Sequence, residues 1–147
     1  MKKRRGARTA AEAPLKFVIT QWRDEFDFDG LANSFSILGE FQELAEAQAY
    51  LHDSANRLIA EQLREHPGWQ RRIMDGKEHA WDRVNKNNKV IEYGSFGIGD
   101  GTGYNSIYTY LELIELPADV GVDEKLFDVE YCRYDVSRYF KAELEKL

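Results

Sequence analysis

The carboxylates best placed for chemistry in this sequence are Glu25, Asp27 and Asp29, which occupy alternate positions directly before Gly30. Alternate acidic residues followed by a glycine form the front half of an EF-hand calcium loop. That loop needs a bidentate glutamate at its last position, where this chain has Ser36, and the flanking residues have the pattern of strands instead of helices. The sequence therefore predicts a solvated acidic hairpin turn and no metal site.

A second candidate is the glycine-rich stretch at residues 94–103, GSFGIGDGTG. Glycine loops that bind phosphate follow a strand and open a helix. Here the residues that follow have a strand pattern, and no Lys-Ser or Lys-Thr pair is present. The stretch is therefore expected to be a long, flexible hairpin tip, from which Phe96, Ile98 and Tyr104 either anchor the loop or reach a partner.

Basic and aromatic side chains are interleaved in the middle of the chain. Those with the types needed to bind single-stranded nucleic acid, through phosphate neutralisation and base stacking, are Trp69, Arg71, Arg72, Trp81 and Arg83. Acidic neighbours such as Asp75 and Glu78 cancel part of this charge, and tryptophans at this spacing also fill gaps between a helix and a sheet. Residues 69–89 therefore provide the alternative function, a nucleic-acid or small-ligand binding domain.

Groups typical of enzymes are sparse. The histidines, His52, His66 and His79, lie outside any recognisable nucleophile motif, and no His or Cys pair has metal-ligand spacing. Cys132 alternates with apolar residues, which indicates a buried thiol, and a single cysteine excludes an intrachain disulfide. The sequence predicts no catalytic residue, no metal and no cofactor, and favours a protein that is not an enzyme.

The helix pattern is clearest at residues 43–65, where Leu44, Ala47, Leu51 and further apolar residues recur at three- and four-residue spacing. Pro67 and Gly68 end this helix. A second, shorter helix is expected over residues 69–74, and a further turn over residues 77–84.

Strands are expected at residues 15–23, 34–41, 87–93 and 107–116, from β-branched, aromatic and alternating residues. Both faces of residues 107–116 are apolar, which favours a central strand covered on both sides, although an aromatic face shown to a partner is the alternative. Residues 127–134 could form a fifth strand before a helix that begins at Asp135. The competing interpretation joins residues 123–146 into one helix.

These elements predict an α+β fold. We expect an antiparallel sheet of four or five strands with helices packed mainly on one face, in the order ββα(α)ββ(β)α. Residues 15–147 would form a single domain after a disordered basic tail at residues 1–14. No apolar run approaches the roughly 18 residues needed to span a bilayer, so a cytoplasmic location is expected.

Charge divides the chain unevenly. The first 14 residues hold five basic side chains against Glu12 alone, a net of +4, and the whole chain carries −6, so the remainder carries −10. A body this acidic repels nucleic-acid phosphates and favours basic partners, including the basic clefts that hold DNA or RNA in other proteins. An acidic surface that serves only solubility is the alternative.

Together these features favour a small acidic protein-binding protein, an inhibitor or adaptor that occupies a basic surface of a larger partner. Phage and mobile-element antagonists of nucleic-acid-handling host defence complexes, of the anti-CRISPR or antirestriction type, often have this composition, although no motif carries the likeness. The candidate partner-binding residues are Asp24, Glu25, Asp27, Asp29, Phe96, Asp100, Tyr104, Tyr108 and Tyr110.

Overall fold

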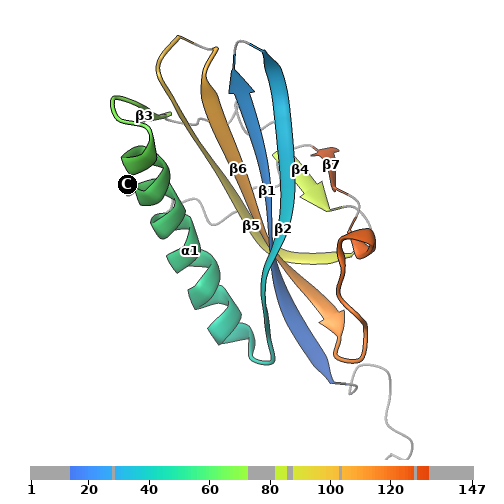
Figure 1. Cartoon of the computed structure of the whole chain (residues 1–147). Coiled ribbons are helices and arrows are strands. Elements are labelled where there is room, and N and C mark those ends of the chain that lie inside the picture. The colour runs from blue at the N-terminus through green and yellow to red at the C-terminus, as the bar shows by residue number, and fades with distance from the viewer. Residues whose placement is uncertain are drawn as a thin grey trace, which may run out of the picture.

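The structure, a computed structural model, describes residues 14–27, 29–72, 82–85, 88–102, 104–127 and 129–132 of the 147-residue chain. The elements follow in the order β1 (Leu15–Asp27), β2 (Gly30–Phe41), α1 (Leu44–Glu65), β3 (Gln70–Arg72), β4 (Asp82–Asn85), β5 (Lys89–Gly99), β6 (Ser106–Pro117), the one-turn 3-10 helix η3 (Glu124–Leu126) and β7 (Val129–Cys132) (Figure 1).

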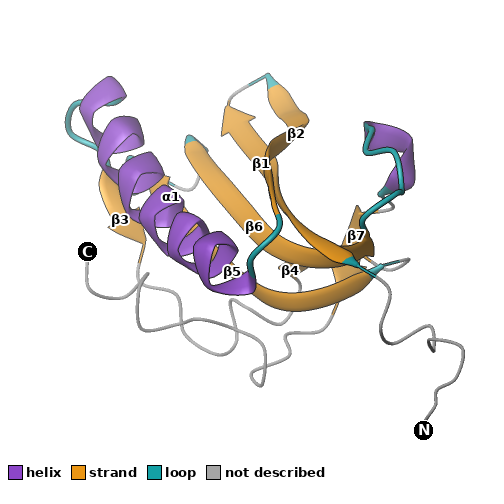
Figure 2. Cartoon of the chain, turned by 90° about the horizontal axis from the view of Figure 1, so that it is seen from below, coloured by secondary structure: helices purple, strands orange, loops and turns teal. Residues whose placement is uncertain are grey.

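The main sheet is antiparallel and has five strands in the order β2-β1-β6-β5-β3, while β4 and β7 pair in a separate two-stranded sheet. Two long hairpins, β1–β2 and β5–β6, lie side by side because β1 also pairs with β6 along its length. The helix α1 packs on one face of the sheet (Figure 2). The expected α+β class and antiparallel sheet are confirmed.

The central strand β6 is buried on both faces, as its two apolar faces predict. Toward α1, Leu111 and Leu113 join a cluster with Leu51 and Ile59 of the helix. On the opposite face, Ile114 and Leu116 join Val18, Val90, Tyr93 and Phe127, with Val122 and Leu126 packed against them. The sheet therefore has a core on each side, and β6 is structural.

Two bulges interrupt the regular pairing of the main sheet. The register of β1 with β2 shifts after Ile19, and that of β5 with β6 shifts between Val90 and Glu92. Each shift inserts one extra residue, Leu38 in β2 and Ile91 in β5. Both extra side chains pack against the core cluster that includes α1, so the bulges add apolar contacts beneath the helix.

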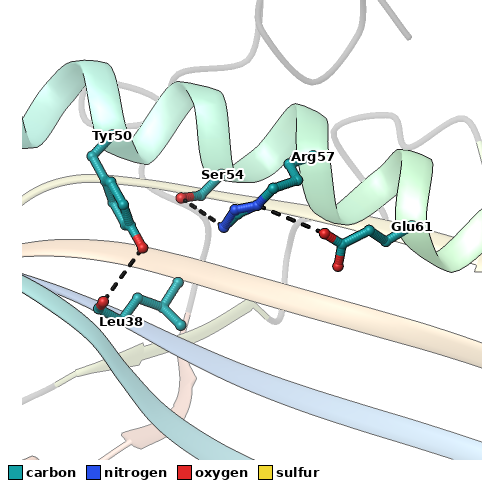
Figure 3. Close-up of polar contacts among 5 residues, drawn as sticks. All are labelled: Leu38, Tyr50, Ser54, Arg57 and Glu61. Carbon is teal, nitrogen blue, oxygen red and sulfur yellow. Dashed lines mark hydrogen bonds and ion pairs between the residues drawn. The ribbon is translucent and has the colours of Figure 1, made fainter.

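Polar contacts join α1 to β2 and link side chains within the helix. The Tyr50 hydroxyl donates to the Leu38 carbonyl at 3.3 Å (Figure 3). Farther along, Arg57 donates from Nη2 to Ser54 Oγ at 3.4 Å and lies 3.7 Å from Glu61 through Nε. The helix begins and ends within one residue of its predicted limits.

Several local expectations were wrong. Residues 70–72 form strand β3, which pairs with β5, in place of a helix. Gly68, at φ 89°, lets the chain turn back after Pro67 and reach the edge of the sheet. The described strand β4 at residues 82–85 also overlaps the turn expected at residues 77–84.

The glycine stretch is also different from its expected form. Strand β5 continues to Gly99, so a short turn at residues 100–105 replaces the expected long hairpin tip. A Cβ atom on Gly97 would lie 2.8 Å from the Tyr108 ring, and one on Gly99 would lie 2.9 Å from the Asn105 carbonyl oxygen. These two glycines therefore allow close packing between strands and do not supply flexibility.

The ends of other elements differ from the sequence prediction. Strand β1 continues to Asp27 and β2 begins at Gly30, so the acidic turn is tighter than expected. Strand β7 confirms a strand within residues 127–134, and together with η3 it excludes a single helix over residues 123–146. The helix expected from Asp135 lies outside the described residues. Within the described chain, no helix is long and apolar enough to cross a membrane.

Candidate functional site

The connections of the two long hairpins lie at the same end of the sheet. Phe26 pairs with Ser106, and Ser106 pairs with Gly99, so the β1–β2 and β5–β6 turns are neighbours (Figure 1, top). Gly99 also pairs with Gln70, which brings the start of β3 to the same end. Residues far apart in the sequence therefore gather at one end of the sheet.

This end of the sheet carries most of the partner-binding residues that the sequence nominated. Glu25, Asp27 and Asp29 are exposed, Asp100 is half-buried, and Tyr104 is 62% exposed. Leu31 is 49% exposed at the same end of the sheet, on the face that carries Phe26 and not Glu25. We call this group of residues the tip surface, composed of Glu25, Asp27, Asp29, Leu31, Asp100 and Tyr104. It combines four carboxylates with two large exposed apolar or aromatic side chains.

Leu31 was not a sequence candidate, because the turn was expected to include it. In the structure it pairs across the hairpin with Phe26, whose ring meets Tyr108 edge-on at 5.9 Å. This row of Leu31, Phe26 and Tyr108 runs from the exposed edge toward the middle of the sheet. Alternation along residues 31–37 is the only sequence signal that could have placed Leu31 on a strand.

Short-range hydrogen bonds shape the first turn. The backbone N–H of Asp29 donates to Asp27 Oδ1 at 2.8 Å, and Gly30 has φ 129°, a conformation that side chains disfavour. In the described chain, neither aspartate forms an ion pair. The fold therefore leaves both carboxylates facing solvent.

The second turn is built around Asp100. Its carboxylate accepts hydrogen bonds from the Thr102 hydroxyl at 2.6 Å, the Thr102 N–H at 2.9 Å and Asn105 Nδ2 at 2.8 Å. The Thr102 hydroxyl, followed by Asn105, lowers the pKa of Asp100 below its ordinary value. This carboxylate therefore stays ionised at neutral pH and adds negative charge to the tip surface.

The remaining partner-binding candidates are withdrawn from solvent. Asp24 is 0% exposed and accepts a hydrogen bond from Trp22 Nε1 at 2.7 Å, while Phe96 is 1% and Tyr110 is 9% exposed. Tyr108 is half-buried against Phe26. Asp24, Phe96 and Tyr110 therefore belong to the interior of the sheet, where a partner cannot reach them in this conformation.

The nucleic-acid candidates are only partly described. Trp69 stacks on the His66 ring, with centroids 4.1 Å apart, and Arg71 lines a cavity of about 460 Å³ together with Asp100, Thr102 and Asn105. Trp81 lies outside the described residues, as do the side chains of Arg72 and Arg83. The cavity mixes one cation with the carboxylate of the tip surface, so it is not a continuous basic groove.

Titratable groups elsewhere show no catalytic arrangement among the described residues. His52 Nε2 lies 3.0 Å from Glu92 Oε2, and this pair ties α1 to β5 at a half-buried position. No group of three His, Cys, Asp or Glu side chains in the described chain could hold a metal ion.

Comparisons with protein-family models, curated proteins and solved structures gave no match. The tip surface is therefore the feature from which a function can be inferred.

Proposed function

We propose that this chain is a protein-binding protein, an inhibitor or adaptor, that occupies a basic surface of a larger partner through its tip surface. The observation that carries the proposal is that the two neighbouring turns bring Glu25, Asp27, Asp29 and Asp100 to one end of the sheet, where Leu31 and Tyr104 are also exposed. Protein interfaces usually combine exposed apolar or aromatic side chains with charged ones at their rim.

The charge of the chain supports a basic partner. The body carries −10, so long-range attraction would guide a positively charged surface toward it and repel nucleic acid. The basic clefts of nucleic-acid-handling proteins carry the positive charge that such an attraction requires. An antagonist of a host defence complex, of the anti-CRISPR or antirestriction type, is the form of this function that the composition favours.

The test is recovery of a partner from an extract of the native host with the tagged full-length chain. The triple variant Glu25→Gln, Asp27→Asn and Asp29→Asn removes three tip charges but keeps the side-chain oxygen that accepts from Asp29 N–H. We expect it to bind the recovered partner about tenfold more weakly at low salt, because rim charges act mainly on the association rate.

The matched control is Glu46→Gln, Asp53→Asn and Asp119→Asn, which removes the same charge from exposed positions away from the tip surface. It should bind the partner as the unchanged chain does. Equal weakening in both triples would mean that only total charge matters, and unchanged binding in the tip triple would refute the proposed site.

Nucleic-acid binding is the alternative outcome. A gel-shift assay would use full-length chain in which Lys2, Lys3, Arg4, Arg5 and Arg8 are replaced by Gln, so that the tail does not contribute. The proposal predicts no shift of a single-stranded oligonucleotide at low salt. Tight, salt-sensitive binding that Arg71→Gln weakens would favour the basic and aromatic middle region instead.

A further inference from the structure

The outer edge of β2 is unusually accessible for strand pairing. Among the described strands β2 lies at the end of the sheet and pairs with β1 alone, and residues 30–34 are all exposed. Ten consecutive residues, 30–39, carry no charge and include no proline. Natural proteins usually protect an edge of this length with lysine, proline or a covering element, because its free backbone groups can pair with another chain.

The hairpin register shows which backbone groups face outward. Asp27 pairs with Gly30 across a two-residue connection, and the pair that closes such a hairpin exchanges both of its hydrogen bonds. The next pair, Phe26 with Leu31, therefore exchanges no hydrogen bonds, and the alternation continues along the strands as far as the bulge at Leu38. The N–H and C=O groups of Leu31 and Asn33 consequently point away from β1, toward the open edge.

We propose that this edge binds an extended segment of a basic protein, whose uncharged centre pairs with residues 30–37 and whose ends carry lysine or arginine. The inference rests on the proposed function and identifies how the partner is held. Main-chain hydrogen bonds to β2 would supply much of the affinity, as in other cases of strand addition.

The acidic residues at the two ends of the uncharged stretch 30–39 favour a bound segment with basic ends. Asp27 and Asp29 lie at one end, and Glu40 and Glu43 lie at the other, where Lys16 contacts Glu40 at 3.2 Å. A segment with basic ends would meet carboxylates on both sides of an uncharged middle. The carboxylates at the turn make no ion pair within the described chain, so they are the stronger attraction.

The same charges oppose a second copy of this chain. A twofold pairing of β2 with itself about Ser34 would place Asp29 of each copy one residue from Glu40 of the other. Although these two side chains would point to opposite faces, both ends of the paired strands would be acidic, and each body already carries −10, so the two copies would repel each other. Self-association through β2 is therefore an outcome that would contradict the inference.

Side chains beside the edge would add sequence preference. Leu31 is 49% exposed and continues the row formed by Phe26 and Tyr108, so it offers an apolar contact to alternate residues of an incoming strand. On the opposite face the edge presents Ala32 and Ser34, which are small and exposed. The arrangement favours larger β-branched side chains in the bound segment on that face.

The experiment uses the full-length chain and two synthetic peptides with the same alternating threonine and valine centre, one with lysines at both ends and one with glutamates. Binding is measured by titration, and backbone amide exchange locates it. We expect the lysine peptide to bind at least about tenfold more tightly, and to slow exchange at Leu31 and Asn33.

The variant Asn33→Pro removes an outward N–H without removing a hydrogen bond to β1, and Asn33→Thr is the matched control that keeps the N–H. Loss of peptide binding in the proline variant alone supports the inference, provided that its thermal unfolding resembles that of the control. Equal binding by both variants, equal binding of both peptides, or a dimer with protected β2 amides in sedimentation would overturn it.

The two proposals fail in different ways. If binding of the native partner requires the tip charges but tolerates Asn33→Pro, the proposed binding through the tip surface is supported and strand addition is wrong. If binding of the lysine peptide requires the Asn33 N–H, but binding of the native partner is unchanged in the triple variant of the tip surface, the edge site is supported and the proposed tip interface is wrong.

Discussion

At the scale of single residues, the glycines of β5 have a different role from the one their clustering suggests. Gly97 faces Tyr108 on β6, and the Tyr108 ring in turn meets Phe26 on β1. The absence of a side chain at residue 97 lets the ring approach the strand closely. A row that begins at a glycine and ends at the exposed Leu31 thus links the interior of the sheet to its edge.

Replacing Gly97 by alanine tests this close approach. The new Cβ would lie 2.8 Å from two atoms of the Tyr108 ring, so the ring or the strand must move. We expect Gly97→Ala to lower the free energy of unfolding by about 1–3 kcal/mol in urea denaturation. The control Gly121→Ala meets nothing within 4 Å and should be neutral or slightly stabilising. If Gly97→Ala were as stable as Gly121→Ala, the Tyr108 ring would be shown to move aside without a loss of stability.

At the scale of elements, a buried polar contact fixes where α1 lies on the sheet. Gln62 Nε2 donates to Thr109 Oγ1 of β6 at 3.1 Å, and the two residues are 1% and 0% exposed. Apolar packing between a helix and a sheet tolerates some sliding, whereas a buried hydrogen bond has one satisfactory geometry. The pair therefore contributes to the register of α1 as well as to stability.

The pair predicts a non-additive result. Thr109→Val removes the acceptor and leaves Gln62 Nε2 buried without it, which should cost about 1–3 kcal/mol of unfolding free energy. Adding Gln62→Leu replaces both partners by apolar groups, so the double variant should recover part of that loss. The measurement is a double-mutant cycle by urea denaturation. Simple addition of the two single effects would contradict a coupled pair.

At the scale of the whole molecule, the topology concentrates charge at one end. Two hairpin turns separated by about 70 residues of sequence become neighbours because β1 pairs with β6. Four carboxylates thereby gather on a body that is already acidic, an arrangement that folding alone does not favour. Concentrated like charge that costs stability is typical of surfaces retained for binding.

This view predicts that the tip charges do not stabilise the fold. Neutralising Glu25, Asp27 and Asp29 relieves repulsion and removes no ion pair in the described chain, so the unfolding free energy should stay within about 0.5 kcal/mol or rise. Thermal unfolding of the triple variant and its matched control at low salt checks this. A loss above about 1 kcal/mol in the tip triple alone would show that these carboxylates have a structural role.

The sequence by itself determined the elements whose signals are local and repeated. Apolar spacing located α1 to within a residue, two apolar faces identified β6 as a covered central strand, and alternation identified β1 and part of β7. These patterns suffice because burial on a helix stripe or a strand face leaves a periodic trace in the chain.

Only the tertiary structure decided the structural roles of the glycines in β5, of residues 70–72 and of the tip carboxylates. Gly97 and Gly99 lie in a strand because Tyr108 and Asn105 approach them from β6 and the following turn, and residues 70–72 form a strand because the edge of β5 is available. Similarly, pairing between β1 and β6 buries Asp24 and brings Asp27 near Asp100. These outcomes depend on contacts between distant residues, which no local pattern encodes.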